Sequence, residues 1–205
     1  KAVNALSGLF AVESFRDKKV KCIEFESGSL VSNNTVKKTD ELDGTKVEFI
    51  PDSEIFKSFN YNISHIKDKL WNYVYLNRGL VISFNNEKLH SKNGLKDFLE
   101  KKINLEKIMY DIIHIHESDL EICITHTTEY NEEYFSFVNG QFTPQGGTHL
   151  IAFKEAIVKT IKEFYNKDFN PKDIKSGISC AISLRIQDPI FESQTKTKLG
   201  STHIA

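Results

Sequence analysis

Residues 178–200 read ISCAISLRIQDPIFESQTKTKLG and join a regular strand pattern to a polar, lysine-containing loop. From residue 178 to 186, apolar side chains alternate with small or polar ones, which predicts a β-strand with one buried face. Asp188-Pro189 ends that strand. Residues 194–201 carry two ammonium groups and several hydroxyls, a composition that suits an anion such as phosphate. The alternative is a solvated loop without a ligand, and composition alone favours it.

Strand and helix patterns continue on the N-terminal side of this stretch. Residues 150–164 carry apolar side chains at helical spacing, with charged residues on the opposite face. Alternation at residues 120–124 and 134–138 predicts two further strands with one buried face each. A short helix is expected at residues 95–101. The second half of the chain is therefore predicted to be α+β.

The first half also mixes strands with a helix. Residues 9–14 and 19–26 are predicted to form a hairpin, and residues 44–50 a third strand. The polar segment at residues 28–44 is expected to be irregular. Residues 63–74 carry apolar side chains at helical spacing, which predicts an amphipathic helix packed on a sheet. This half is α+β as well.

A polar break, Ser91-Lys92-Asn93-Gly94, separates these two periodic halves. It follows a short predicted strand at residues 80–84. We therefore predict two domains, residues 1–92 and residues 93–205.

Composition excludes some classes of protein. The 27 basic and 28 acidic residues leave a formal charge of -1, so global attraction does not by itself argue for nucleic acid or a membrane surface. No apolar run approaches the roughly 20 residues that a membrane-spanning helix needs. Cys22, Cys123 and Cys180 are far apart and lack metal-ligand spacing, which fits reduced thiols in a cytoplasmic protein.

The N-terminus lacks both an initiator methionine and a signal-peptide pattern. The apolar run at residues 2–6 begins without a helix-capping residue before it. We therefore expect the chain to start inside a helix and to be incomplete at this end.

Two other segments are candidate sites with weaker signals. Paired glycines in Gln145-Gly146-Gly147-Thr148-His149 free backbone N–H groups for a ligand, but a tight turn with Thr148 capping the following helix is the favoured interpretation. His114 and His116 have a spacing compatible with a metal, yet no third ligand is evident, so surface histidines are expected and no metal site is predicted. The sequence contains no Walker-type loop, nucleophile elbow or zinc signature.

Taken in order, a set of short motifs resembles the ATPase subunits of bacterial type IIA DNA topoisomerases, gyrase and topoisomerase IV, which belong to the GHKL superfamily. The resemblance covers nearly the whole chain, and its most specific part is the stretch from Asp188 to Gly200. The other motifs are Ala2-Val3-Asn4-Ala5-Leu6-Ser7, Gly44-Thr45-Lys46-Val47, Leu76-Asn77-Arg78-Gly79, Asn93-Gly94-Leu95-Lys96-Asp97-Phe98 and Gly146-Gly147-Thr148-His149. The resemblance implies the C-terminal part of a GHKL (Bergerat) ATP-binding α/β sandwich in residues 1–92, followed by a transducer domain like the second domain of ribosomal protein S5 in residues 93–205.

The resemblance also implies roles for four residues. Thr45 would help an upstream aspartate recognise adenine, and Val47 would line the apolar wall of that pocket. Two residues apart on one strand, these side chains point to the same face, although ordinary strand packing explains them too. In the family, the Gln-Thr-Lys loop reaches the nucleotide, so Gln194 and Lys196 would contact the γ-phosphate of ATP as catalytic and nucleotide-binding residues.

Other parts of the family's active site have no counterpart in this chain. The glutamate that activates water, the asparagine that holds Mg²⁺, the adenine-binding aspartate and the glycine-rich lid precede Lys1 in the family. Gln194 and Lys196 can stabilise phosphoryl charge, but neither is a plausible base for water. ATP and Mg²⁺ are thus expected in the full-length parent, and this chain alone is expected to be inactive.

The resemblance implies that ATP closes a dimeric gate and that the transducer passes this state toward DNA cleavage and strand passage. The implied partners are DNA, a second ATPase subunit in a homodimer, and the DNA-cleaving A-type subunit in a heterotetramer. One alternative is a nucleic-acid-binding module without ATPase function; another is the transducer of a mismatch-repair or chaperone ATPase of the same superfamily. The regions that separate gyrase from topoisomerase IV lie outside this chain, and our interpretation leans to topoisomerase IV.

Overall fold

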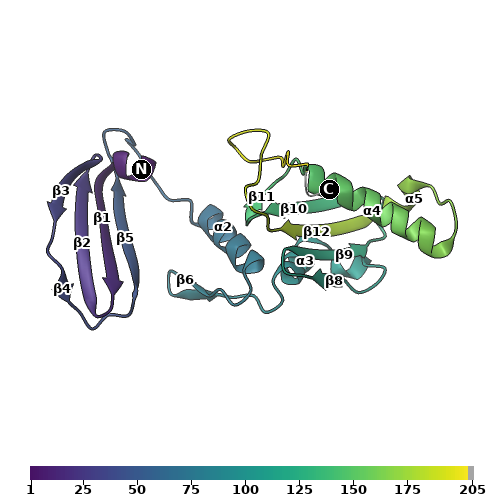
Figure 1. Cartoon of the computed structure of the whole chain (residues 1–205), viewed down its shortest axis with the longest axis horizontal. Helices are drawn as coiled ribbons and strands as arrows, with labels where there is room; N and C mark the ends of the chain where they lie inside the picture. Colours follow the sequence, from purple (N-terminus) through teal and green to yellow (C-terminus); the bar gives the residue numbers. More distant parts are fainter. Residues whose placement is uncertain (203–205) are drawn as a thin grey trace. The chain divides into compact units, whose positions relative to one another are not determined.

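The computed structural model describes residues 1–202 and divides the chain into two compact units, Lys1–Asn62 and Ile63–Ala205. Both units mix helices and strands, which agrees with the predicted α+β class (Figure 1). No helix in the described part of the chain is long and apolar enough to cross a membrane.

The first unit is an antiparallel sheet with strand order β3-β2-β1-β5 (Figure 1). The short strand β4 pairs with the N-terminal end of β2. Its elements are α1 (Ala2–Ala5), β1 (Ser7–Arg16), β2 (Lys19–Glu26), β3 (Ser29–Asn33), β4 (Lys37–Lys38) and β5 (Gly44–Pro51). The predicted hairpin is confirmed, and its turn residues Asp17 and Lys18 both have positive φ, as a tight two-residue turn between twisted strands requires. The prediction of an irregular segment at residues 28–44 is wrong, because polar β3 and β4 pair along the edge of β2.

One face of this first sheet is apolar. The register places Val12 between Val47 on β5 and Ile23 on β2, with phenylalanines from all three strands in the next row. Val47 is 54% exposed.

The second unit contains a five-stranded sheet of order β11-β10-β12-β9-β8 and a separate hairpin, β6-β7. The strands are β6 (Ile82–Phe84), β7 (Glu87–Leu89), β8 (Ile113–His116), β9 (Leu120–His126), β10 (Glu133–Val138), β11 (Gln141–Phe142) and β12 (Ile178–Leu184). The helices are α2 (Ile63–Leu76), α3 (Leu95–Lys102), the short 3-10 helix η1 (Leu105–Lys107), α4 (Thr148–Tyr165) and α5 (Pro171–Lys175). In the sheet, β12 runs parallel to β10 and antiparallel to β9.

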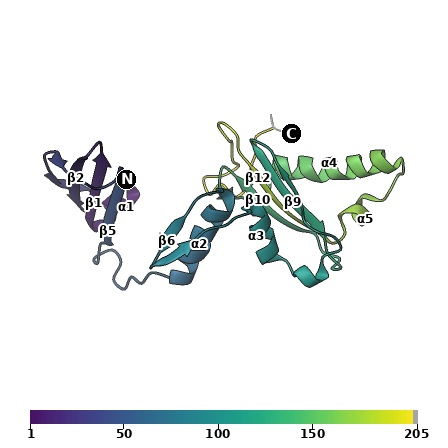
Figure 2. The ribbon, with the colours of Figure 1, turned by 90° about the horizontal axis from the view of Figure 1, so that it is seen from below.

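Strand β12 lies in the middle of this sheet and is buried on both faces. Cys180 and Ile182 pack with β9 under α4, whereas Ala181 on the opposite face packs with Phe98 of α3 (Figure 2). The prediction that only one face of this strand is buried is therefore wrong. Its alternate positions are small residues such as Ser183, and small side chains allow a helix to pack closely on the sheet.

Helix α4 covers the sheet with the first part of its apolar stripe. Leu150, Phe153 and Ile157 pack on the β9 and β12 side chains. Phe164, expected on the same buried stripe, lies in the last turn of the helix and is 80% exposed.

Helix α2 belongs to the core of the second unit. Tyr75 and Leu76 are buried beside Phe98, and the Tyr75 and Phe98 rings lie 5.8 Å apart. The Arg185 guanidinium donates to the Leu76 carbonyl at 3.2 Å, which satisfies a carbonyl that the end of a helix leaves without an intrahelical partner. The second compact unit accordingly begins at Ile63. The division into domains 1–92 and 93–205 stays a prediction.

Gly177, just before β12, lies against neighbouring backbone that leaves no room for a side chain. Its φ is +77°, and a Cβ there would overlap the Thr127 carbonyl oxygen and lie 2.7 Å from that of Glu129. Gly140 has the same φ with nothing within 4 Å. Gly140→Ala should lower the free energy of unfolding by about 1–2 kcal/mol through strain alone. Gly177→Ala should cost at least about 2 kcal/mol more because of overpacking, and equal losses in urea unfolding would contradict this packing.

Candidate functional site

The polar loop that follows β12 is a hairpin. The Gly200 amide donates to the Ile190 carbonyl at 2.8 Å, and the Glu192 amide to the Lys198 carbonyl at 3.1 Å. At the tip, the Lys196 amide donates to the Ser193 carbonyl at 3.1 Å, which closes a tight turn. The loop therefore has a first arm at residues 190–192, a tip at residues 193–196, and a second arm at residues 197–200.

The two lysines of the loop have different surroundings. Lys198 forms an ion pair with Glu192 at 2.7 Å, so its charge is already balanced. Lys196 is at the tip with a positive φ of 55°, and its ammonium lies 5.8 Å from the centre of the Phe191 ring. Among residues 1–202, no carboxylate forms an ion pair with Lys196. Its ammonium is thus the one of the two that is free to bind an added anion.

The Gly-Gly-Thr segment, residues 146–148, pairs with the second arm of the loop. The Leu199 amide donates to the Gly146 carbonyl at 3.0 Å, and the Thr148 amide donates to the Leu199 carbonyl at 3.2 Å. The Thr148 hydroxyl donates to the Ser201 carbonyl at 2.5 Å instead of capping α4. The predicted N-cap is therefore wrong: Gly147 occupies the cap position and Thr148 is the first helical residue.

Gly147 makes this pairing possible. Its φ is +135°, and a Cβ at this position would overlap the Leu199 carbonyl oxygen and lie 2.6 Å from the Leu199 nitrogen. No larger residue allows such an approach of the two backbones without a shift.

Behind this segment lies a buried polar cluster. His149 is 5% exposed, and its Nε2 lies 2.9 Å from the Ser136 hydroxyl. Ser136 also contacts the Thr143 hydroxyl, and the Thr143 hydroxyl donates to the Ser136 carbonyl at 2.9 Å. Burial lowers the pKa of His149 to about 4, so the imidazole is neutral near pH 7 and can join this network without a counter-ion.

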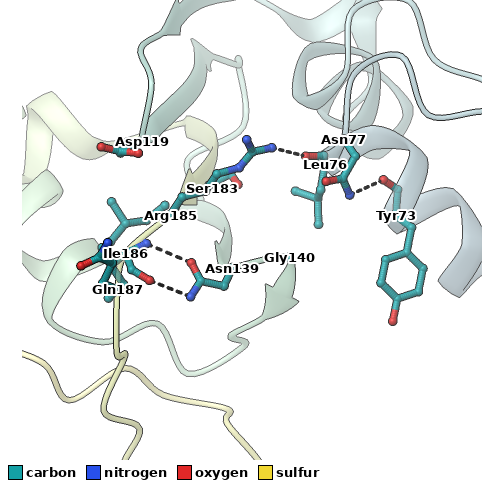
Figure 3. A pocket seen from close by; sticks show the side chains of 11 residues that line it. Tyr73, Leu76, Asn77, Asp119, Asn139, Gly140, Ser183, Arg185, Ile186 and Gln187 are labelled. Atoms are coloured by element: carbon teal, nitrogen blue, oxygen red, sulfur yellow. Dashed lines mark hydrogen bonds between the residues drawn. The ribbon is translucent and has the colours of Figure 1, made fainter.

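The root of the loop lines an open cavity of about 1060 Å³ at the end of β12 (Figure 3). Here the Asn139 side chain both accepts from the Ile186 amide and donates to the Ile186 carbonyl, each at 2.9 Å. Arg185 reaches from the same strand end to α2, as its bond to Leu76 shows (Figure 3). The strand end that leads into the loop is thus fixed by side chains on both sides.

Thr45 and Val47 lie on β5 of the first unit. The register pairs Thr45 with Ser14 and Val47 with Val12, so both side chains lie on the apolar face described above. Gln194 and Lys196 belong to the second unit. The assignment of all four residues to nucleotide binding stays a prediction.

The two candidate metal-ligand histidines lie beside Glu121. His114 Nε2 lies 2.8 Å from Glu121 Oε1 and 3.0 Å from an Arg78 guanidinium nitrogen. The His116 side chain is exposed as expected, but that of His114 is only 18% exposed, because the pairing of β8 with β9 sets it against this buried carboxylate. Within residues 1–202, no group of three or more His, Cys, Asp or Glu residues has the arrangement of a metal site.

The sequence profile of the family described as DNA gyrase B matches residues 92–205, more than half of the chain. The chain therefore belongs to the DNA gyrase B family of type II topoisomerase subunits. Over 201 residues, it is 45% identical to the B subunit of DNA topoisomerase 4 from Borreliella burgdorferi, covering 98% of this chain and 33% of that protein. It is 32% identical to the B subunit of DNA gyrase from Cytophaga aurantiaca, covering 98% of this chain and 48% of the relative. The chain thus spans between a third and a half of these relatives.

Solved structures give the same assignment. The 43K ATPase domain of Thermus thermophilus gyrase B, in complex with an aminocoumarin, matches with a TM-score of 0.77 at 30% identity, over 97% of this chain and 59% of that one. The topoisomerase IV ATP-binding domain of Francisella tularensis, in complex with a small-molecule inhibitor, matches with a TM-score of 0.77 at 29% identity, over 98% of this chain and 61% of that one. The predicted family and its ATPase-domain fold are confirmed.

The buried imidazole predicts a pH dependence of stability. The pKa of His149 is 6.5 when unperturbed and about 4 in the folded chain, so between these values the unfolded state binds the extra proton. The contribution of the neutral, buried His149 to the free energy of unfolding is complete above pH 6.5. It is lost as the pH falls toward 4, by up to about 3 kcal/mol. The free energy of unfolding of His149→Gln should therefore fall less steeply over this range than that of the wild type. Identical slopes would show that His149 is not buried in its neutral form.

Proposed function

We propose that this chain is the energy-coupling part of the ATPase subunit of a type IIA DNA topoisomerase, and that its loop tip senses the γ-phosphate of ATP. The observation that carries the proposal is the Lys196 ammonium, which has no ion-pair partner among residues 1–202 and lies at the tip of a hairpin whose other lysine is paired with Glu192. Gln194, in the same turn, offers an amide that can donate to a phosphate oxygen. Charge-assisted bonds to a phosphate contribute about 1.5–3 kcal/mol each, enough to distinguish ATP from ADP.

The adenine end of ATP would lie on the apolar face of the first sheet. Thr45 supplies a hydroxyl at one end of that face, and Val47 supplies a half-exposed apolar surface. This arrangement suits a purine, which is flat and carries polar groups at its edge.

Hydrolysis needs a base for water and a ligand for Mg²⁺, and the two loop residues are not expected to supply either. Lys196 and Gln194 can stabilise the charge of a transferring phosphoryl group, but neither can deprotonate water. We therefore assign the base and the Mg²⁺ ligand to other parts of the parent subunit and expect this chain alone to be inactive.

In the parent enzyme, ATP would close a gate between two copies of this subunit and drive passage of one DNA segment through another. The cleaving subunit would be a separate A-type chain, giving a heterotetramer that acts on DNA in the cytoplasm. The three free cysteines support a reducing compartment. The two alternatives, a plain nucleic-acid-binding module and another GHKL transducer, lose support from the match to the gyrase B family. The 45% identity to a topoisomerase IV subunit favours that enzyme over gyrase.

Replacement of Lys196 in the full-length subunit tests the phosphate contact. Lys196→Ala should lower the ATP turnover rate at least about tenfold, because a cation held at a phosphoryl group in a dry site contributes about 1.4 kcal/mol or more there. Lys196→Arg should not restore the full rate, since a planar guanidinium does not replace a compact ammonium.

Lys198→Ala is the matched control, because that lysine lies in the same loop but is paired with Glu192. Its effect on turnover should be smaller. Wild-type turnover in the Lys196→Ala subunit, with folding intact by circular dichroism, would mean that the loop is merely solvated.

A further inference from the structure

We propose that His149 is a positioning residue for the loop tip, acting through the Gly-Gly-Thr segment that pairs with the second arm of the loop. This inference rests on the proposed role of Lys196 in sensing phosphate. It assigns to a buried histidine the task of holding the Lys196 ammonium in a fixed position.

The segment and the loop are joined backbone to backbone. Leu199 donates a hydrogen bond to Gly146 and accepts one from Thr148. Gly147, between them, has no side chain, so the two backbones are in direct contact. Any shift of the segment therefore moves Leu199. Only two residues separate Leu199 from Lys196, so the tip shifts with it.

The segment itself is held by a closed ring of hydrogen bonds. The Gly146 amide donates to the Thr143 carbonyl at 2.8 Å, and the Thr143 amide donates to the Ser136 carbonyl at 2.8 Å. His149 Nε2 completes the ring at the Ser136 hydroxyl. Because both Ser136 and His149 are buried, water cannot easily replace this bond when it is lost.

The effect of losing this bond should be local. His149 contributes a side-chain hydrogen bond to Ser136, whereas Cys180 belongs to the apolar cluster of β9 and β12 side chains under α4. Removing the imidazole should therefore loosen the segment and the loop while the central strands stay closed. Cys180→Ala gives the opposite pattern and serves as the matched control, since it weakens the core under α4 without touching the ring.

Amide hydrogen exchange in this 205-residue chain measures the difference directly. In His149→Leu, the Leu199 and Thr148 amides should exchange at least about tenfold faster than in the wild type, while the Ile182 amide in β12 changes little. His149→Gln should restore most of the protection, because its amide can still reach Ser136. In Cys180→Ala, Ile182 should accelerate at least as much as Leu199. Equal acceleration of Leu199 and Ile182 in His149→Leu, or none at Leu199, would overturn the proposal.

Ser136→Ala tests the same hydrogen bond from its other partner. The variant removes only one hydroxyl group, so it is expected to fold even if His149→Leu does not. It should give the same local acceleration at Leu199. Unchanged exchange at Leu199 in folded Ser136→Ala would equally overturn the proposal.

A binding measurement in the full-length subunit separates this inference from the proposed function. The readout is the ratio of the dissociation constants of ADP and a non-hydrolysable ATP analogue. Lys196→Ala and His149→Leu should both reduce that ratio by at least about fivefold, with little change in ADP binding. If Lys196→Ala leaves the ratio unchanged, the proposed function fails. If Lys196→Ala reduces the ratio and His149→Leu does not, the positioning role alone is wrong.

Discussion

Two backbone hydrogen bonds of Leu199, one to Gly146 and one from Thr148, decide where the loop tip of this protein can lie. A surface hairpin without such support samples many positions, and a lysine at its tip would contribute little to any bound anion. These two bonds fix the second arm of the loop to the segment that begins α4. The absence of a side chain at Gly147 allows the two backbones to lie close together, and the buried hydrogen bonds of Ser136 and His149 hold the segment in place.

The rigidity of the loop depends in turn on β12. This strand is buried on both faces, and it leads into the loop through Arg185 and Ile186, which are bound to α2 and to Asn139. Helix α2 therefore contacts the same strand end that carries the loop. The helix, the strand end and the loop are thus joined by hydrogen bonds within one compact unit.

Local patterns predicted much of this from the sequence alone. Period-two alternation located the strands, and it placed Thr45 and Val47 on one face, as the register of β5 bears out. The same alternation misled at Ser183, because a small polar residue on a buried face looks like one that faces water. The hydrogen bond between His149 and Ser136 could not be predicted from local patterns, because the two residues lie 13 positions apart on different elements. The sequence signal was limited to a histidine in the first turn of a helix, two positions after paired glycines.

The central claim is that Lys196 contacts the terminal phosphate of bound ATP in the parent subunit. A crystal structure of that subunit with a non-hydrolysable ATP analogue tests it most directly. Lys196 Nζ should lie about 2.7–2.9 Å from a γ-phosphate oxygen, the usual length of a charge-assisted hydrogen bond, with the Leu199 bonds to Gly146 and Thr148 intact. An ordered nucleotide with Lys196 turned toward solvent, or with Lys198 at the phosphate in its place, would contradict the account.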